Sequence, residues 1–511
     1  MRGDISRGLM PADDEVVIRS MSINSRLPAQ LEKAIERNIV LRIGWTTSGE
    51  AVPKQGELGL CPVLPKGSRI RSLGYLGPFT AAFGQGGTFT HQGTCDSFLG
   101  AANDGNIITC EREAGANVGY SMRSGRITVL DGVSHDAGAA MSGGLLIVRG
   151  DAGARIGGGM SGGEIIVHGD VGPDPGAGMT GGKIIINGRC PPTPPGVILR
   201  PLDKKEVDAI NKLLSEPDLH IPSDAVCLVS DGERCEGVMA SCSADFSGIA
   251  IVPSDNDHEP EHSTCDMVRL IGDKFTLALP IPILPFIANG APAELFHPCL
   301  VESNPRDVDI VLIGKDNIVD APKLLAKSAG FALDLDSLPH LDGAAIDGLL
   351  VALGAIAGLE AKTLMLQGVS RTARLHAQAE HHQIDAAVSV INDGSGISAA
   401  ACLPLVGRNA SASLDNTKAA VMLPWAATSE DLAILSASNI SFAISHPPDA
   451  DVEGWLNRIS AGLSAHLNRL GLASIDQMTR ANLRACDQDT AAVSGLRLAG
   501  YDRPMPHWFA R

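Results

Sequence analysis

The chain has 511 residues, which at roughly 100–200 residues per domain predicts two to four domains. Its 41 Lys and Arg against 58 Asp and Glu give a net charge of −17, and this acidic balance without a basic run excludes nucleic-acid binding. A hydrophobic content of 44% excludes a disordered chain, and the 57 glycines follow no strict Gly-X-Y period, which excludes collagen.

No segment is predicted to cross or enter a membrane. Met1–Val17 is charged and has no apolar run of the signal-peptide kind. Phe275–Ala288 is short and interrupted by prolines, and Gly348–Leu359 has only twelve residues. The 11 cysteines form no C-x-x-C pair, which predicts reduced thiols. We therefore expect a cytoplasmic protein.

Residues 1–80 are predicted to form an N-terminal cap region, and residues 81–190 to form a stack of 19-residue coils, one coil being one turn of a solenoid. The methionines Met122, Met141, Met160 and Met179 are each 19 residues apart. A period of 19 is too short for two helices but fits one turn made of short strands. The pattern predicts a right-handed parallel β-helix.

Two columns of glycine keep the same 19-residue step. We interpret them as structural, because glycine at a fixed corner adopts positive φ without a Cβ clash. A phosphate-binding loop is the less favoured alternative, since no coil places its glycines before a helix. The columns are Gly119, Gly138, Gly157 and Gly176, and Gly125, Gly144, Gly163 and Gly182.

These glycine-rich coils resemble the β-helix domain that ends the large subunit of glutamate synthase. They are also similar to one of the subunits of formylmethanofuran dehydrogenase and to a small subunit of N-methylglutamate synthase. In those relatives the domain mostly carries or docks catalytic domains, so the resemblance implies a scaffold and does not by itself fix a function.

Residues 191–300 are predicted to be a linker and polar-loop region. The proline-rich run after Cys190 cannot continue a sheet ladder, and a helix is expected over Lys204–Glu216. One polar loop contains residue types that can bind metals, but it lacks a helical ligand register, and a solvated acidic loop is favoured over a metal site. Those residues are His258, Glu261, His262 and Cys265.

Residues 301–511 alternate apolar strand-like runs with helical stretches, which predicts a parallel sheet in either a (β/α) barrel or a doubly wound fold. The expected strands are 309–313, 331–335, 363–366, 386–391, 420–423 and 441–444. Ligands bind at the carboxyl ends of such strands. These ends carry Gly314–Asp316, Asp334, Asp336, Gln367–Gly368, Asn392–Gly396 and His446.

The C-terminal segment also carries a resemblance. Asp451–Leu470 is predicted to be an amphipathic helix ended by Gly471, and Ser474-x-x-Gln477 predicts the start of another helix. The run from Leu470 to Leu496 resembles the end of the FMN-binding barrel of glutamate synthases. The expected fold is therefore mixed: a parallel β-helix followed by an α/β domain like a degenerate (β/α) barrel.

Several departures from that family limit what the resemblance implies. The family barrels carry a cysteine triplet for an iron–sulfur cluster, and its absence here predicts that no such cluster is bound. The family's glycine-rich flavin run survives only as Asp342-Gly343. FMN is the cofactor that the resemblance implies, although a plain strand-end turn is favoured over an anion-binding loop at Asp393–Gly396. The candidate cofactor residues are Asp342, Gly343, Gly368, Asp393, Gly394 and Gly396, and no catalytic or metal-binding residue is assigned.

A histidine-rich run belongs to a predicted helix. His376 and Glu380 are four residues apart and therefore share a face, whereas the adjacent His381 and His382 point in different directions. A polar helix face is favoured over a metal site.

Two functions follow from these patterns. The first is a component of a glutamate-synthase-like oxidoreductase or amidotransferase system that acts on amino nitrogen. The second is a non-catalytic scaffold that docks catalytic partners. In either case we expect partner subunits or further copies to bind the lateral faces of the coils. Those faces present the columns Arg149, His168 and Asn187, and Arg126, Leu145, Glu164 and Lys183.

Overall fold

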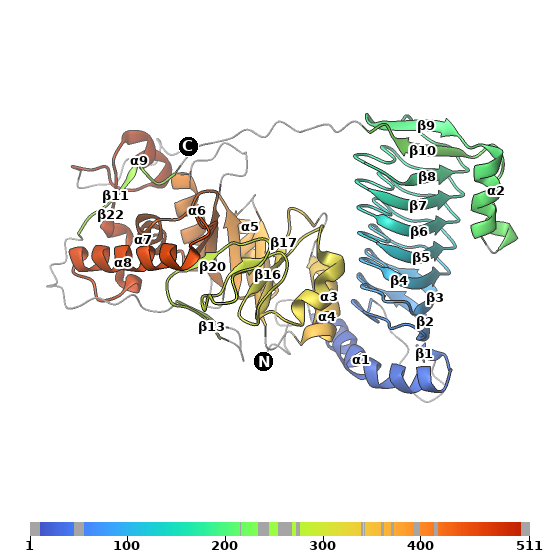
Figure 1. The fold of residues 1–511 in the computed structure, drawn as a ribbon, viewed down its shortest axis with the longest axis horizontal. Helices are drawn as coiled ribbons and strands as arrows, with labels where there is room; N and C mark the ends of the chain where they lie inside the picture. The colour runs from blue at the N-terminus through green and yellow to red at the C-terminus, as the bar shows by residue number, and fades with distance from the viewer. Residues whose placement is uncertain are drawn as a thin grey trace.

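The computed structural model describes residues 11–44, 56–214, 216–232, 245–253, 268–271, 276–338, 341, 343–358, 362–368, 372–391, 399–412 and 417–501. It is a mixed α/β structure with two parts, a stack of coils and a barrel of parallel strands, which lie side by side (Figure 1). The helix α1 (Pro11–Glu36) lies at the base of the stack.

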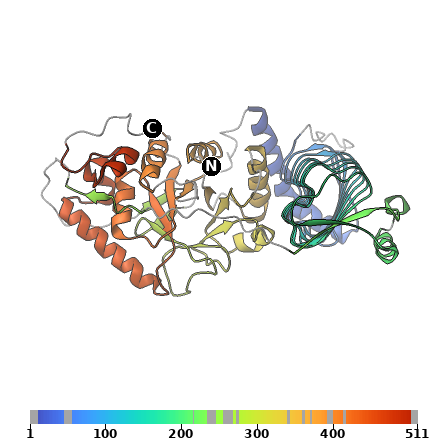
Figure 2. The same ribbon diagram turned by 90° about the horizontal axis from the view of Figure 1, so that it is seen from above.

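The coil stack is built on one large sheet of parallel strands. Arg126 is paired with Leu145, Leu145 with Glu164, and Glu164 with Lys183, so each step to the next strand advances the chain by 19 residues. A second ladder of parallel bridges joins Cys95, Ala114, Val133, Ala152 and Val171 in the same step. Figure 2 looks along the stack and shows the coils superimposed. The strands are β1 (Leu41–Ile43), β2 (Arg69–Leu76), β3 (Thr88–Cys95), β4 (Asp104–Cys110), β5 (Ser124–Val129), β6 (Ser142–Val148), β7 (Gly162–Val167) and β8 (Lys183–Ile186).

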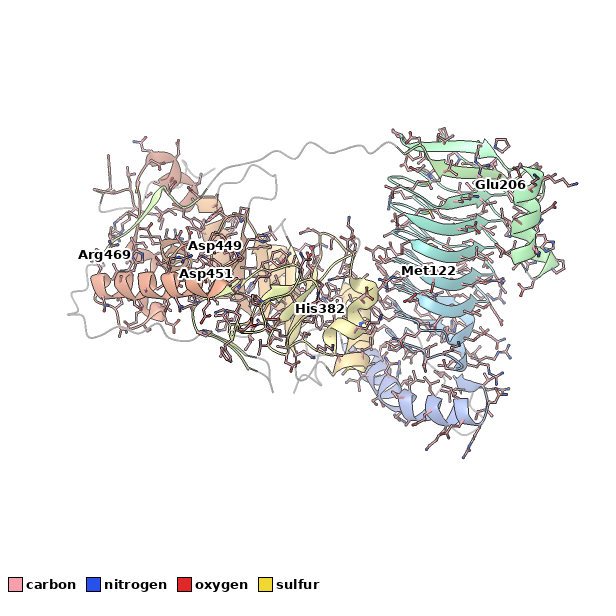
Figure 3. All side chains as sticks on the ribbon, viewed as in Figure 1. Met122, Glu206, His382, Asp449, Asp451 and Arg469 are labelled. Atoms are coloured by element: carbon pink, nitrogen blue, oxygen red, sulfur yellow. The ribbon has the colours of Figure 1, made fainter. Side chains whose placement is uncertain are left out.

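The stack encloses an apolar interior. Ile127, Leu146, Ile165 and Ile184 occupy one column and are fully buried. The methionine column lies in the same core cluster, and Figure 3 shows Met122 within the coils. Unbranched, polarizable methionine fills such interior space well.

Both glycine columns have positive φ. The values are 67°, 70°, 66° and 73° for Gly119, Gly138, Gly157 and Gly176, and 95°, 85°, 87° and 82° for Gly125, Gly144, Gly163 and Gly182. A Cβ added to Gly163 would lie 2.9 Å from the carbonyl carbon of Gly143 in the coil below. Backbone conformation and close stacking therefore both require glycine here.

The chain returns to the top of the stack after the proline-rich segment. Two strands, β9 (Val197–Pro201) and β10 (Val226–Ser230), extend the large sheet in the order β8-β10-β9, with β10 antiparallel to both neighbours. Between them are α2 (Lys204–Leu213) and the short helix η2 (Pro217–Leu219). The first part of residues 191–300, expected to be linker, thus belongs to the stack.

Helix α2 covers part of the lateral face on which a partner was expected. Val207 and Ile210 of α2 pack on Ile147, Ile166 and Ile185, which point outward from β6, β7 and β8. The Glu206 carboxylate receives hydrogen bonds from Arg200 at 2.7 and 2.8 Å and from Lys183 at 3.3 Å. Figure 3 shows Glu206 on the side of the stack away from the barrel. At the Lys183 end of the column Arg126, Leu145, Glu164 and Lys183, the chain's own helix α2 therefore occupies the surface on which a partner was expected.

The second part is a nearly closed barrel of eight parallel strands. Neighbouring strands follow one another in chain order, and a bridge between Phe286 and Leu300 links the first strand to the second. The sequence predicted six of them and missed the first two. The strands are β14 (Ile283–Pro285), β15 (Leu300–Val301), β16 (Ile310–Ile313), β17 (Gly330–Asp334), β18 (Thr363–Gly368), β19 (Ala386–Val390), β20 (Lys418–Leu423) and β21 (Phe442–Ser445).

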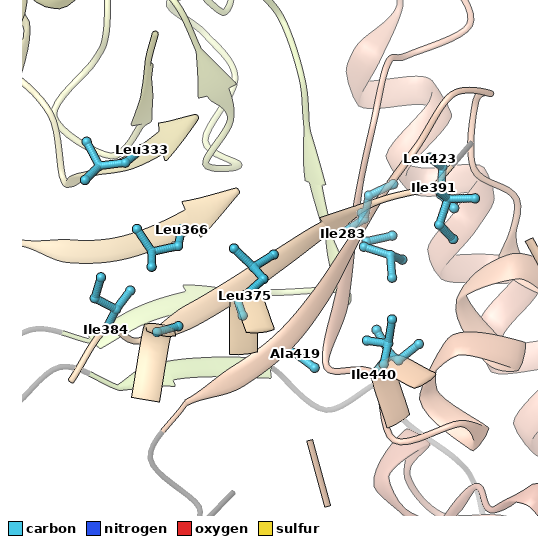
Figure 4. Close-up of a cluster of buried hydrophobic side chains, with 14 of the residues drawn as sticks. Ile283, Leu333, Leu366, Leu375, Ile384, Ile391, Ala419, Leu423 and Ile440 are labelled. Carbon is cyan, nitrogen blue, oxygen red and sulfur yellow. The ribbon is translucent and has the colours of Figure 1, made fainter. Parts of the chain in front are cut away.

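Helices cover the outside of six strands. Between β14 and β16, where every residue is described, no helix is present. Figure 4 shows part of the apolar layer outside the strands, including Leu333, Leu366 and Leu375. The helices are α3 (Ala321–Leu325) with η3 (Ile318–Asp320) before it, α4 (Gly343–Ala357), α5 (Thr372–His381), α6 (Ala399–Ala412), α7 (Ser429–Ala437) and α8 (Val452–Leu470).

Smaller elements complete the barrel part. Leu277 and Leu279 of β13 (Thr276–Leu279), which is paired with β12 (Val268–Ile271), belong to the core inside the barrel. β11 (Ile249–Ile251) pairs with β22 (Leu483–Ala485), and α9 (Gln488–Ser494) follows. At the position where Ser474 predicted a capped helix, only the single turn η5 (Ile475–Gln477) forms, without a side-chain cap; a second turn, η6 (Arg480–Asn482), precedes β22.

The stack and the barrel share one apolar interface. Phe79 and Phe98, from successive coils, stack at 4.5 Å and belong to the same core cluster as Ile346 and Leu349 of α4. A Cβ on Gly348 of α4 would lie 2.8 Å from the Pro78 carbonyl oxygen, so glycine permits the close approach. Further along the interface, Arg123 forms an ion pair with Asp320 at 2.7 Å. Within the described ranges, no helix combines the length and apolar character needed to cross a bilayer.

Candidate functional site

The carboxyl ends of the barrel strands form the mouth at which such folds bind ligands. Side chains alternate between the two faces of a strand. A residue two positions after a side chain that packs inside the barrel therefore also faces the barrel axis. This rule places Gly314, Asp334, Gln367 and His446 around the mouth. The ring of His446 lies 4.7 Å from that of Phe286, which follows β14. The sequence predicted these strand ends as ligand positions, except that of β14.

One side of the mouth is fixed by hydrogen bonds of the chain to itself. The Asn317 amide donates to the carbonyls of Leu312 at 2.8 Å and Glu302 at 2.9 Å, and its oxygen accepts from the Gly314 N–H at 2.9 Å. The Ser337 hydroxyl accepts from the Lys315 N–H at 3.3 Å. The loops after β15, β16 and β17 are thereby tied together.

Gln367 is a buried polar side chain at this mouth. It is 5% exposed, and among the described residues its Oε1 atom has no hydrogen-bond partner. A buried amide oxygen without a partner is unfavourable by about 1–3 kcal/mol, so it indicates a place where a ligand N–H or a water can bind. The adjacent Gly368 makes only ordinary contacts, because a Cβ there would lie 3.5 Å or more from its neighbours. Gly368 is therefore not a cradle that only glycine can form.

Several donors of the loop after β20 are bonded within the protein. The Asp431 carboxylate accepts from the Thr428 N–H at 2.8 Å, the Thr428 hydroxyl at 2.9 Å and the Trp425 ring N–H at 3.2 Å. The Ala427 N–H donates to the Ser445 hydroxyl at 3.0 Å. Burial raises the pKa of Asp431 above its ordinary value. An internal carboxylate thus occupies the anion-binding N-terminus of α7.

The loop after β21 is similarly unsuited to an anion. Pro447 and Pro448 have no N–H group, and Asp449 and Asp451 place carboxylates at the start of α8, as Figure 3 shows. The Asp451 side chain accepts from the Gly454 N–H at 2.9 Å. In barrels of this kind, the loops after the seventh and eighth strands frequently bind a phosphate. Here those strands are β20 and β21, and their described loops do not fit the phosphate of FMN.

Of the six predicted cofactor residues, the structure describes only Gly343 and Gly368. Asp342, Asp393, Gly394 and Gly396 lie outside the described residues. Gly343 is the first residue of α4, with open space where a Cβ would be. The continuation of the Asp342-Gly343 run serves the fold, because Gly348 contacts the coil stack.

The histidine-rich helix differs from its predicted polar character. His376 and His382 are buried, and His382 Nδ1 lies 2.8 Å from Asp347 Oδ1 of α4. Burial lowers the pKa of His376. Among the described residues no group of three or more His, Cys, Asp or Glu side chains can hold a metal. His258, Glu261, His262 and Cys265 lie outside them.

Sequence reasoning missed the Asp431 cluster, although a signal for it was present. Thr428-x-x-Asp431 is a capping-box pattern, in which the acidic residue three positions after the cap bonds back to the cap N–H. The pattern predicts that these donors are occupied.

Comparisons with known proteins address the two parts separately. The GXGXG motif family matches residues 19–195, which include most of α1 and the coil stack up to β8. No curated protein matches the chain. A mandelate oxidase variant with a monooxide FMN adduct is a similar solved structure, with 13% identity, a TM-score of 0.35, and coverage of 47% of this chain and 88% of that chain.

Two further solved structures are similar at the same level. For inosine 5′-monophosphate dehydrogenase from Legionella pneumophila the identity is 15% and the TM-score 0.35, with 48% of this chain and 99% of that chain covered. For a flavocytochrome b2 variant with benzoylformate the identity is 12% and the TM-score 0.33, with 50% of this chain and 80% of that chain covered.

Proposed function

We propose that this chain is a non-catalytic scaffold subunit of a glutamate-synthase-like redox system. The GXGXG motif, which occurs in glutamate synthase-like proteins, supports the link to that system. The observation that carries the scaffold role is the state of the loops after β20 and β21. The N–H groups of Thr428 and Ala427 are bonded to Asp431 and Ser445, and Pro447 and Pro448 have no N–H group. The carboxylates of Asp449 and Asp451 stand at the start of α8, so these loops are poorly suited to a flavin phosphate.

We assign the coil stack to the right-handed parallel β-helix class as part of this proposal. Its support is the 19-residue register of two ladders and the positive φ of the corner glycines. Such a stack is rigid along its axis, because each coil contacts only its two neighbours and repeats their geometry. A rigid stack that shares a core with a barrel can hold partner subunits at fixed positions.

A flavin-binding oxidoreductase is the second candidate, and one observation favours it. The orphaned Gln367 oxygen at the mouth can accept a hydrogen bond from the N–H edge of a bound heterocycle. FMN would be the implied cofactor. Amino-nitrogen chemistry belongs to the same candidate, because it depends on a working redox centre.

Titration of the purified full-length chain with FMN separates the two candidates. The scaffold proposal expects no visible flavin absorbance after purification and no heat of FMN binding by calorimetry. Stoichiometric FMN binding that is weakened by Gln367→Ala but not by Leu213→Ala, a change at an exposed position on α2 of the stack, would overturn it in favour of the oxidoreductase.

A further inference from the structure

One side of the barrel lacks its covering helices. Residues 286–299 and 302–309, which connect β14 to β15 and β15 to β16, are described throughout and contain no helix. In a (β/α) barrel each strand is normally followed by a helix on the outside. Two loops therefore take the place of two helices here, and their outer surface is available to another molecule.

These loops are held rigidly by one buried ion pair. Arg306 donates to Asp309 at 2.6 and 2.9 Å, and Asp309 is fully buried. The same guanidinium donates to the carbonyls of Pro292 at 3.1 Å, His297 at 2.9 Å and Leu295. Planar guanidinium groups are suited to such multiple, oriented bonds. The loop from Pro292 to His297 is thus fixed from inside the protein.

Phe296 projects from this fixed loop into solvent. Its side chain is 95% exposed, whereas Leu295 and His297 on either side of it are buried. A single exposed apolar residue is common on protein surfaces. A phenyl ring on a rigid support is less ordinary, because it loses little conformational freedom when it enters a pocket, and this favours binding.

The surroundings of Phe296 indicate the chemistry of its partner. Pro292, Ala293 and Val308 are exposed apolar neighbours in the two loops, and Glu294 and Asp307 are exposed acids. Arg306 is the only Lys or Arg of 286–309, and Asp309 and the loop carbonyls occupy it. Lys362, outside these loops, interacts electrostatically with Asp307, so the acidic character beside Phe296 comes mainly from Glu294. A second copy bound through this surface would bring like charges together, since a twofold contact pairs a patch with itself.

We propose that Phe296 anchors a docking site for a partner protein whose surface has an apolar pocket bordered by Lys or Arg. This inference rests on the proposed scaffold role and names the surface through which one partner is held. Aromatic anchors surrounded by a polar rim commonly carry most of the affinity of an interface. The acidic rim adds attraction that salt weakens.

Full-length chain purified under native conditions from its own organism, in parallel with Phe296→Ser and Leu213→Ser variants, tests the proposal. Leu213 is a matched control, 61% exposed on α2 at the far side of the stack. A co-purifying protein is identified, produced separately and titrated calorimetrically against all three forms at low and high salt. We expect binding at least tenfold weaker for Phe296→Ser, unchanged for Leu213→Ser, and weaker in high salt and for Glu294→Lys.

The outcomes distinguish this surface from the scaffold role. An identified partner that binds Phe296→Ser as tightly as wild type overturns the Phe296 site and leaves the scaffold role standing. If the wild-type protein is a dimer and Phe296→Ser dissociates it, the occupant of the site is a second copy of this chain, and the proposed basic partner protein is wrong. A strict monomer that brings down no protein overturns both. Equal melting temperatures of the three forms verify that the exposed substitutions leave the fold intact.

Discussion

Asp347 of α4 and His382, which directly follows α5, make a buried contact, and both side chains are almost inaccessible to solvent. Removing one partner of such a pair leaves the other buried without compensation. We therefore expect Asp347→Ala to lower the free energy of unfolding by roughly 2–4 kcal/mol, measured by urea denaturation. Asp347→Asn, which keeps a hydrogen-bonding side chain of the same size, should lose clearly less. Equal losses in the two variants would contradict the assigned contact.

Asp431 gives a pH-dependent prediction. Because burial raises its pKa in the folded state, the native protein binds this proton more tightly than the unfolded chain. Below the ordinary pKa of an aspartate, Asp431 is protonated in both states and does not destabilise the fold. As pH rises toward its raised pKa, the unfolded chain loses the proton more readily than the native protein, so the free energy of unfolding falls. The melting temperature of Asp431→Asn minus that of wild type should increase over this range and then level off. A difference that falls with rising pH would show that the sign is wrong.

Single residues at the mouth were only partly predictable. Asp334, Gln367 and His446 follow strand-like runs, so their place at the carboxyl ends could be read from the sequence. The burial of Gln367 and the internal bonds of Asp431 depend on neighbours that are distant in the chain. No local pattern encodes such neighbours.

At the scale of elements, the corner glycines give a graded prediction. Gly163 has φ of 87°, and a Cβ there would meet the backbone of Gly143 and Gly144 at 2.9–3.0 Å. Gly159 has φ of 64°, but a Cβ added to it would have no atom within 4 Å. We expect Gly163→Val to cost about 3 kcal/mol or more, and Gly159→Val about 1–2 kcal/mol from backbone strain alone.

Thermal denaturation followed by circular dichroism compares these two variants, with Gly157→Val as a third. Gly157 also has positive φ, and its Cβ would lie 2.6 Å from the Ile184 side chain, which can move more readily than backbone. The expected order of destabilisation is Gly163, then Gly157, then Gly159. An unchanged melting temperature for Gly163→Val would contradict the role of this column.

Elements with a strong period were predictable and short ones were not. The 19-residue repeat located β5 to β8 from the sequence, and α8 ends at Gly471 in the left-handed conformation, as expected. β14 and β15 have three and two residues, too few to display an alternation of apolar and polar side chains. Prolines beside β14 obscured it further. The stack begins at β1, ahead of residue 81. The sequence missed these early coils because the methionine repeat starts only at Met122, although Gly67, Gly86 and Gly105 continue one glycine column with positive φ.

At the scale of the whole molecule, the contact between stack and barrel can be tested at Gly348. Glycine inside a helix is less favourable than alanine by about 1 kcal/mol. Helix propensity alone therefore predicts that Gly348→Ala stabilises α4. A Cβ at this position would instead collide with the Pro78 carbonyl. We expect Gly348→Val to separate the two parts and to split one calorimetric unfolding transition into two. Gly343→Val, at an open position at the start of α4, should keep a single transition.

We expect these 511 residues to bind no iron–sulfur cluster. Its sequence contains no closely spaced cysteine triplet, and the eight described cysteines are free thiols, several of them buried in the coil interior. Chemical assay of iron and acid-labile sulfide in anaerobically purified protein should detect neither in stoichiometric amount. Three to four irons per chain, on the order of one cluster, would contradict the expectation.

The reversal of strand direction at the top of the stack has a consequence for assembly. Parallel coils expose the same edge at every level, so an open end could accept the first coil of another molecule and grow into a fibre. Here β10 runs antiparallel to β8, and the outermost strand β9 ends at Pro201, which has no N–H to donate. A strand from another molecule would therefore find no parallel coil at this end with which it could pair in register. The length of the stack is therefore set within one chain, and end-to-end polymerisation is blocked at this end by the same residues that fold over it.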